Sequence, residues 1–416
     1  MEYTPRVVDR ELSEALGILG AVLIEGPRAC GKTATSMQQG ASSVRLDVDP
    51  GALQLAQLDP MILLAGETPR VIDEWQLAPQ LWNAVRRAVD DRQARGQFIL
   101  TGSSVPADDD TRHSGAGRIL RLRMRPMSFF ESGHSDGSVS LAKILQGDSV
   151  GGSGAHLSLV ETIDQLCIGG WPALQGLPVG AAQKALRTYL DDVALVDVAR
   201  VDAQRRDPER VGKVMRALAR NVATEVSAAR LAMDAGSDGE PMKATTLDAY
   251  LAALRRLMVV ENQDSWAPHL RSRDAVRKAP KRHFVDPSLA VAAMGASPTT
   301  LLTDVNTLGF LFESLVVRDL RVYSQSLDGV VKHYRDHAGI EVDAIVELSD
   351  GSWAAFEIKL GEGRVDGGAA SLLKFATKVD TTKSGVPRAL VVITTGQFAY
   401  TRKDGVHVVP LSLLGP

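Results

Sequence analysis

Gly26-Pro27-Arg28-Ala29-Cys30-Gly31-Lys32-Thr33 is the stretch that decides the fold of the first part of this 416-residue chain. It fits the pattern G-x-x-x-x-G-K-S/T at every fixed position, and it follows residues 21–24, which read as a buried strand. Small residues in such a loop let backbone N–H groups point at phosphates, and the following helix offers its N-terminus to the same charge. We expect these eight residues to bind a nucleotide, with Lys32 at the β- and γ-phosphates and Thr33 on Mg²⁺.

Two further apolar strands end in polar side chains. The first ends in adjacent carboxylates, where Asp73 is expected to hold the Mg²⁺ shell and Glu74 to orient and polarise the attacking water. The second ends in hydroxyl groups, and Ser103, or alternatively Thr101, is the candidate sensor of the γ-phosphate. An ordinary turn or helix N-cap is the simpler explanation of those hydroxyls. Three strands with helical spacers predict a parallel sheet of the phosphate-loop kind.

Four arginines at nearly alternating positions follow in residues 117–126. On a strand, Arg121, Arg123 and Arg125 would share one face. They fit an arginine-finger set, a DNA-facing stripe or a solvated edge strand, and the sequence leaves these alternatives open. Arg118, directly after a glycine, is the best candidate for a finger.

Composition excludes several classes of protein. Hydrophobic residues make up 44% and charged residues 23%, with a net charge of −3, so neither a disordered chain nor a uniformly basic nucleic-acid coat is expected. The apolar runs are too short to span a bilayer, and the first residues lack the apolar core of a signal peptide. Two cysteines exclude a disulfide framework and fit a reducing cytoplasm. The length predicts two to three domains.

These motifs occur in an order that resembles a known family. The phosphate loop, residues 71–76, 100–104 and 117–118, Pro126-Met-Ser-Phe-Phe-Glu131 and Gly169-Gly-Trp-Pro-Ala173 are similar to those of a widespread prokaryotic AAA+ family with a C-terminal domain of formerly unknown function. The resemblance covers nearly the whole chain. It implies ATP as the nucleotide and an AAA+ module that works as an oligomer, and it supplies no substrate.

The middle of the chain predicts a helical segment. Residues 132–154 are rich in Gly and Ser and read as a linker or long surface loop. Residues 155–168 and 179–201 have helical spacing and are expected to form a small lid, with Asp197 on a solvated helix face.

A winged helix is the expected arrangement after the lid. Helices are predicted at 207–221, 227–234 and 243–259, and a basic hairpin follows them. The candidate DNA contacts are polar side chains at the third helix and in the hairpin: Lys243, Thr245, Thr246, Arg271, Arg273, Arg277, Lys278, Lys281 and Arg282. A protein-interaction module or an AAA+ lid is the alternative.

The C-terminal part resembles the PD-(D/E)xK restriction-endonuclease-like fold. A helix carries Glu313, one strand carries Asp343, and the next carries Glu357 and Lys359 in an E-x-K pattern with apolar flanks. The resemblance implies Mg²⁺ held by Asp343 and Glu357, with Glu313 completing the cluster and Lys359 positioning or activating water. Charges inside an otherwise apolar strand need such a reason.

Together these features predict an α/β protein of three parts. They are a P-loop AAA+ parallel-sheet module at 1–154, a helical and winged-helix domain at 155–300, and a restriction-endonuclease-like α/β domain at 301–416. The leading expectation is ATP-dependent action on DNA with Mg²⁺-dependent cleavage. The alternatives are a DNA-binding switch ATPase that does not cut, and a scaffold of the STAND type whose assembly depends on nucleotide exchange.

Overall fold

A five-stranded sheet forms the first part of the protein. The computed structural model describes residues 3–103, 114–154, 157–199, 207–237, 239–268 and 279–416. The sheet has the order β2-β3-β4-β1-β5, and each pairing is parallel. This confirms the predicted parallel sheet and adds β2, which the sequence analysis did not identify. The strands are β1 (Ala21–Glu25), β2 (Ser42–Arg45), β3 (Arg70–Asp73), β4 (Phe98–Gly102) and β5 (Ile119–Arg123).

Helices cover both faces of this sheet. Val22 and Ile24 pack into one apolar cluster and Ala21 and Leu23 into another, so β1 is buried on both sides, as is typical of parallel sheets. The helices and short 3₁₀ turns are α1 (Val8–Leu16), α2 (Lys32–Gln39), α3 (Pro50–Leu58), η1 (Pro60–Leu64), η2 (Trp75–Leu77) and α4 (Leu81–Arg92).

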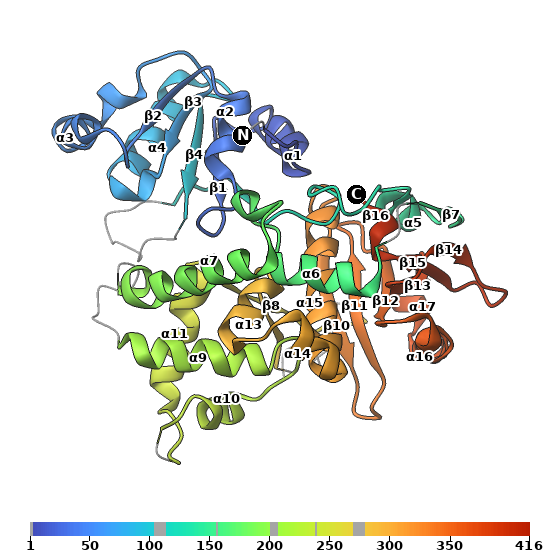
Figure 1. Ribbon diagram of the computed structural model, residues 1–416. Helices are drawn as coiled ribbons and strands as arrows, with labels where there is room; N and C mark the ends of the chain where they lie inside the picture. The colour runs from blue at the N-terminus through green and yellow to red at the C-terminus, as the bar shows by residue number, and fades with distance from the viewer. Residues whose placement is uncertain (1–2, 104–113, 155–156, 200–206, 238, 269–278) are drawn as a thin grey trace.

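The middle segment is mainly helical and lies beneath the first sheet in Figure 1. The helix predicted at 243–259 buries Leu247, Tyr250, Leu251 and Leu254 on one side. Helix α13 contacts both α7 and α9 and so forms the centre of the packing. The elements are α6 (Leu159–Ile168), η3 (Pro172–Leu174), α7 (Val179–Asp192), the π-helix η4 (Val193–Asp197), α9 (Pro208–Arg220), α10 (Ala228–Asp234), α11 (Ala244–Arg256), the antiparallel pair β8 (Val260–Gln263) and β9 (Lys281–Phe284), α13 (Pro287–Met294) and α14 (Pro298–Thr303).

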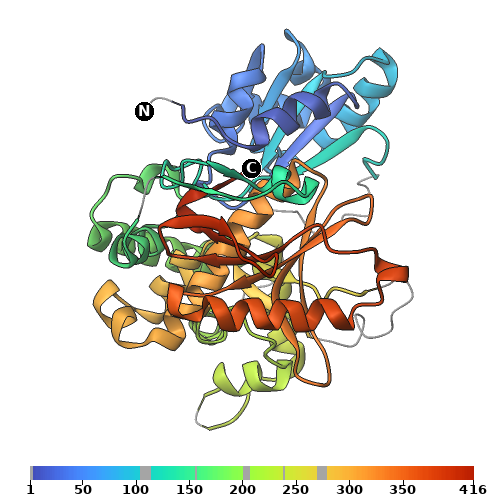
Figure 2. The same ribbon diagram turned by 90° about the vertical axis from the view of Figure 1, so that its right-hand side faces the viewer.

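The C-terminal part is a mixed sheet between helices. The sheet order is β10-β11-β12-β13-β15-β14-β7, with the long helix α15 against β10–β12 and α16 against β11–β13. Figure 2 shows α16, in orange-red, running along one face of this sheet. The elements are α15 (Val305–Gln325), β10 (Val330–Arg335), β11 (Glu341–Glu347), β12 (Trp353–Ile358), η5 (Glu362–Arg364), α16 (Val365–Lys378), α17 (Thr381–Ser384), β13 (Leu390–Thr394), β14 (Phe398–Thr401), β15 (His407–Pro410), η6 (Leu411–Leu413) and β16 (Leu414–Gly415).

The prediction of a linker or long surface loop at 132–154 is wrong, because this segment forms two short strands and a helix against the C-terminal part. It contains β6 (Val139–Ser140), which pairs with β16, and β7 (Gly152–Ser153), which pairs with β14. Between them α5 (Leu141–Gln146) buries Leu141, Ile144 and Leu145. The Gly and Ser content concealed this short apolar stripe.

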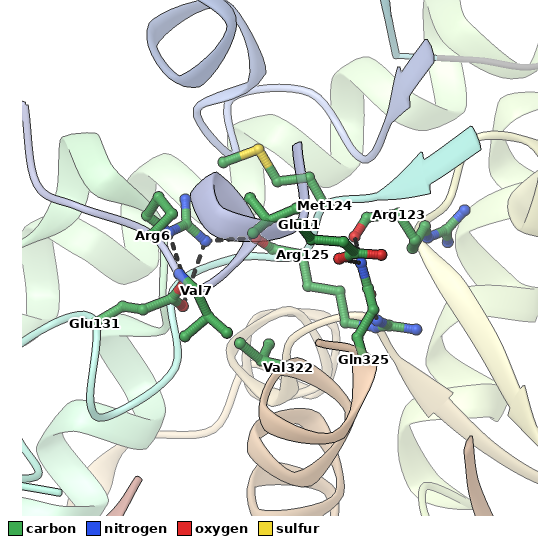
Figure 3. A pocket seen from close by; sticks show the side chains of 10 residues that line it. Arg6, Val7, Glu11, Arg123, Met124, Arg125, Glu131, Val322 and Gln325 are labelled. Carbon is green, nitrogen blue, oxygen red and sulfur yellow. Dashed lines mark hydrogen bonds and ion pairs between the residues drawn. The ribbon is translucent and has the colours of Figure 1, made fainter. Parts of the chain in front are cut away.

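Hydrogen bonds and ion pairs gather at the junction of the three parts. Figure 3 shows the junction, where Arg6 Nε donates to Glu131 Oε1 at 3.0 Å and Gln325 Nε2 donates to Glu11 Oε2 at 2.7 Å. Nearby, Glu261 on β8 accepts from Arg125 of the first part. These contacts hold the first part, the middle segment and the C-terminal part against one another.

Two arginines of the predicted row, Arg123 and Arg125, belong to this junction, whereas Arg121 is exposed. Glu261 forms ion pairs with Arg123 at 2.9 Å, with Arg125 at 3.1 Å and with Arg321 of α15 at 2.9 Å. Arg121 instead pairs with Glu25 on the neighbouring strand.

Candidate functional site

The phosphate loop follows β1 and has a backbone that only glycine accommodates at two positions. A Cβ on Gly26 would lie 2.2 Å from the Met124 carbonyl oxygen, and Gly31 has a φ of 108°. Arg6 Nη1 donates to the Cys30 carbonyl oxygen at 2.9 Å and supports the loop from outside. The loop then enters α2, whose N-terminus points at the space that phosphates would take.

Lys32, Thr33 and Asp73 meet where the sequence predicts a nucleotide and Mg²⁺. Lys32 is buried, and its Nζ donates to the carbonyl oxygens of Gly26 at 3.0 Å and Pro27 at 2.8 Å. Thr33 Oγ1 donates to Asp73 Oδ1 at 2.8 Å. A hydroxyl beside a carboxylate is the oxygen pair that a Mg²⁺ ion would use here.

Glu74 and Ser103 lie side by side at the carboxyl edge of the sheet. Ser103 Oγ donates to Glu74 Oε2 at 3.2 Å, and Gln76 Nε2 also hydrogen-bonds to that carboxylate. Glu74 has a φ of 56°, a left-handed conformation that is costly for a non-glycine residue and is concentrated at functional sites. Thr101 is committed to Asp73, so Ser103 is the better placed of the two hydroxyls to sense a phosphate near Glu74.

Arg28, inside the phosphate loop, reaches the middle segment. Its Nη1 donates to both carboxylate oxygens of Asp197, at 2.9 and 3.0 Å. Asp197 is 6% exposed and ends the π-helix that continues α7. The expectation that Asp197 lies on a solvated helix face is therefore wrong. The phosphate loop packs over this side chain, and the sequence around η4 gives no sign of that contact.

Arg118 lies at the opposite edge of the sheet from the phosphate loop. It directly precedes β5, whose first residue pairs with the first residue of β1, whereas the loop follows the last residue of β1. The strand spans about 15 Å, so Arg118 does not reach the loop of its own chain. It is exposed and pairs with Asp90 at 2.8 Å.

The predicted DNA-contacting residues have different positions. Lys243 and Thr245 are exposed at the start of α11, whereas Arg271, Arg273, Arg277 and Lys278 lie outside the described residues. The prediction that Lys281 contacts DNA is wrong, because this residue is 1% exposed. Successive residues of β9 point to opposite sides of the strand, and Lys281 points to the buried side, whereas Arg282 points to the other.

The nuclease-like residues form a buried cluster of carboxylates and lysines. Lys359 Nζ lies 2.5 Å from Glu357 Oε2 and 3.1 Å from Asp343 Oδ2. Glu313, on α15, does not join them directly but pairs with Lys281 at 2.7 Å. The structure thus brings Asp343, Glu357 and Lys359 together, as the E-x-K pattern predicts, and connects Glu313 to them through a lysine.

Burial and neighbouring charges together shift the pKa values in this cluster. Burial, opposed by Lys281, raises the pKa of Glu313 to about 8, and burial together with Asp343 raises the pKa of Glu357 to about 8. Burial alone would lower the pKa values of Lys281 and Lys359, but the surrounding carboxylates outweigh it and raise both. Both lysines are therefore charged at neutral pH.

The cluster does not fit the divalent metal that its resemblance implies. Within the described ranges, no three His, Cys, Asp or Glu side chains come together in a way that could hold a metal ion. Two ammonium groups stand between the carboxylates instead.

Two residues of these sites were not identified from the sequence. Arg45 of β2 lies 3.6 Å from Asp73, and Glu341 of β11 lies 2.9 Å from Lys281. A signal for Glu341 exists, because it stands two positions before Asp343 on the same strand.

Comparison with known families identifies three matching segments. A model described as an AAA domain matches residues 20–132. Two models described as domains of unknown function, DUF8612 and DUF4143, match residues 160–300 and 308–414. The AAA match supports the predicted ATP binding and hydrolysis at the phosphate loop, and so an AAA-type ATPase module. Every helix in the described part of the chain is too short or too polar to cross a membrane.

Individual relatives are distant. Two uncharacterized proteins, from Mycobacterium bovis and Mycobacterium tuberculosis, are each 26% identical over 358 residues, which cover 84% of this chain and 72% of theirs. A Walker-type ATPase of Pyrococcus abyssi is similar in structure at 15% identity and a TM-score of 0.43, covering 68% of this chain and 94% of that one. A RuvB variant of Thermotoga maritima has 18% identity and a TM-score of 0.24, covering 62% and 88%.

Proposed function

We propose that this protein is an ATP-dependent switch that acts on DNA, in which the nucleotide state of the phosphate loop controls the middle segment. The observation that carries the proposal is the pair between Arg28 of the loop and Asp197 of η4, with both carboxylate oxygens bound to one guanidinium nitrogen. It is a direct polar connection between the nucleotide site and the helices that lead to the DNA-binding candidates.

An incoming triphosphate would act on this pair through its charge. Its oxygens compete with Asp197 for the Arg28 guanidinium, and they repel the carboxylate, which is nearly buried. ATP binding is therefore expected to weaken the contact between the loop and η4, and hydrolysis to restore it. In this proposal Thr33 and Asp73 hold Mg²⁺, Glu74 orients the water and Ser103 senses the γ-phosphate.

The middle segment supports DNA as the partner. Helices α9, α10 and α11 are followed by the antiparallel strands β8 and β9, which is the order of a winged helix. Lys243 and Thr245 are exposed at the start of α11, and the sequence places several basic residues between 269 and 278, after β8 and before β9. These groups suit contacts with the phosphate backbone.

The C-terminal part is proposed to hold DNA or a protein partner without cutting it. Cleavage at Asp343 and Glu357 with Mg²⁺ is the leading expectation from the sequence, but the lysines between the carboxylates favour the non-cutting alternative. We also propose that the protein is an oligomer in which Arg118 of one copy acts at the phosphate loop of the next, since it does not reach its own.

The switch is tested with Asp197→Asn, which keeps the side-chain shape and removes the charge. The affinity for ATP should rise in this variant, because the competitor for Arg28 is weakened. In the wild type, ATP should change the affinity for a short mixed-sequence duplex by about 5- to 150-fold, and in the variant this dependence should disappear. Glu209→Gln, which removes one exposed acid from the same segment, is the control and should behave as wild type.

Two results would refute the proposal. Unchanged coupling between ATP and DNA in Asp197→Asn would mean that the pair transmits nothing. If charge reversal at Arg271, Arg273 and Lys278 left the salt dependence of duplex binding unaltered, the basic residues would not face DNA, because each lost phosphate contact should lower the slope by about 0.9.

A further inference from the structure

Lys281 stands inside the carboxylate cluster of the C-terminal part, although it belongs to strand β9 of the middle segment. Its Nζ lies 2.7 Å from Glu313 Oε1 and 2.9 Å from Glu341 Oε1, and 4.0 Å from Asp343 Oδ1. The lysine side chain is 2% exposed. A buried ammonium at these distances is the local positive charge for carboxylates from α15 and β11.

We propose that Lys281 is a permanent internal cation of this cluster, in the place where a nuclease-like site would hold a divalent metal. The cluster then takes no metal and serves to join the middle segment to the C-terminal part. A Mg²⁺ or Mn²⁺ ion needs the same carboxylate oxygens at about 2.0–2.2 Å, and the ammonium already occupies that space and repels a second cation.

Lys359 is a second lysine that contacts the carboxylate of Asp343. Oδ2 of this carboxylate accepts from Lys359 Nζ at 3.1 Å and from the backbone N–H of Ile358 at 2.8 Å. Oδ1 faces Lys281. Both oxygens of the central carboxylate are therefore directed at cations or donors of the chain itself.

Hydrogen bonds made by neighbouring residues of β8 and β9 hold the backbone around Lys281 against the C-terminal part. Gln263 of β8 donates to the carbonyl oxygens of Lys332 and Asp343, each at 3.0 Å. His283, two positions after Lys281, hydrogen-bonds to Ser314 Oγ at 3.1 Å and to Gln263 Oε1 at 3.0 Å. Movement of β8 and β9 away from the C-terminal part would break these buried hydrogen bonds, so the strand that carries Lys281 is fixed beside the cluster.

Mn²⁺ binding by the full-length chain without nucleotide tests the proposal. The loss of the free Mn²⁺ electron paramagnetic resonance signal counts bound ions at about 0.1–1 mM metal, a range in which weak carboxylate sites fill. The wild type and Asp343→Asn should bind equally, with no ion that depends on Asp343. Lys281→Met, which keeps the apolar stem and removes the charge, should gain about one ion per chain, and Lys281→Met with Asp343→Asn should lose it again.

Lys332→Met is the matched control. It removes a lysine of β10, in the C-terminal sheet, which pairs with Glu347, and it should gain no ion. An ion bound by the wild type and lost in Asp343→Asn would overturn the proposal, and so would a folded Lys281→Met that gains none. If Lys281→Met does not fold, the comparison of the wild type with Asp343→Asn still decides.

The inference rests on the proposed function only in the statement that the C-terminal part does not cut DNA. The metal measurement uses neither ATP nor DNA, so a failure of the switch would leave it untouched.

Discussion

Neutralising Glu261 should destabilise the whole protein, because this carboxylate holds three guanidinium groups at the junction. Arg123 and Arg125 come from the first part and Arg321 from α15, at 2.9, 3.1 and 2.9 Å. Burial alone would raise the pKa of Glu261, but the three arginines outweigh it and hold the pKa well below its usual range. In Glu261→Gln the shape is kept and the negative charge is lost.

The expected loss is about 3–5 kcal/mol, the range found when one partner of a buried ion pair is removed. The arginines remain partly buried, with side chains 28%, 14% and 8% exposed, and are left without their common counter-charge. For a chain of this length unfolding in one transition, this loss lowers Tm by about 3–6 °C. If the parts unfold separately, the shift is larger, since each transition has a smaller entropy.

Calorimetry of the wild type and Glu261→Gln measures this shift. Asp90→Asn is the matched control, because it breaks the pair with Arg118 in which both side chains are more than 40% exposed. Such an exposed pair contributes at most about 1 kcal/mol. Equal Tm shifts in the two variants would refute the reasoning that the junction depends on a desolvated charge cluster.

Four further predictions concern the phosphate loop and the buried histidine. Lys32→Ala should abolish ATP binding, measured by titration with a fluorescent nucleotide, since the loop loses its cation for the β- and γ-phosphates; unchanged affinity would contradict the loop assignment. Glu74→Gln should bind ATP but hydrolyse it at least about 10²-fold more slowly, because an amide does not polarise water as a carboxylate does. Arg118→Ala should lower ATP turnover and leave ATP affinity intact, and equal turnover would place the finger elsewhere. Burial, with the charges of Arg321 and Lys281, holds the pKa of His283 well below its usual value, so its contribution to stability is complete above about pH 6.5 and falls by up to about 1.4 kcal/mol per pH unit below it; a wild-type Tm that fell no more steeply than that of His283→Gln between pH 7 and 5 would contradict this.

The sequence predicts the phosphate loop and its partners because local rules determine them. Gly26 and Gly31 are needed for the backbone itself, and strands that end at Asp73 and Gly102 must meet the loop at one edge of a parallel sheet. The same reasoning succeeds for Asp343, Glu357 and Lys359, which lie on β11 and at the end of β12.

Contacts between distant segments could not be predicted in this way. Asp197 reads as part of an acidic helix face, and only the packing of the loop over η4 makes it the partner of Arg28. From the sequence, the arginines in and after β5 fit an arginine-finger set, a DNA-facing stripe or a solvated strand. The contact of Arg125 with Glu261 of β8 becomes visible only in the structure. Composition also misled at 139–153, where two short strands depend on partners from the end of the chain.

Lys281 shows why a charged residue in a basic run need not face solvent. Along β9, Lys281 and His283 point to one side and Arg282 to the other, so strand periodicity separates neighbours that composition groups together. Lys281 then meets the carboxylate of Glu313, which needs a positive charge because it is buried, and His283 meets the hydroxyl of Ser314. Burial of Lys281 and burial of Glu313 thus depend on each other, because each supplies the counter-charge that the other lacks.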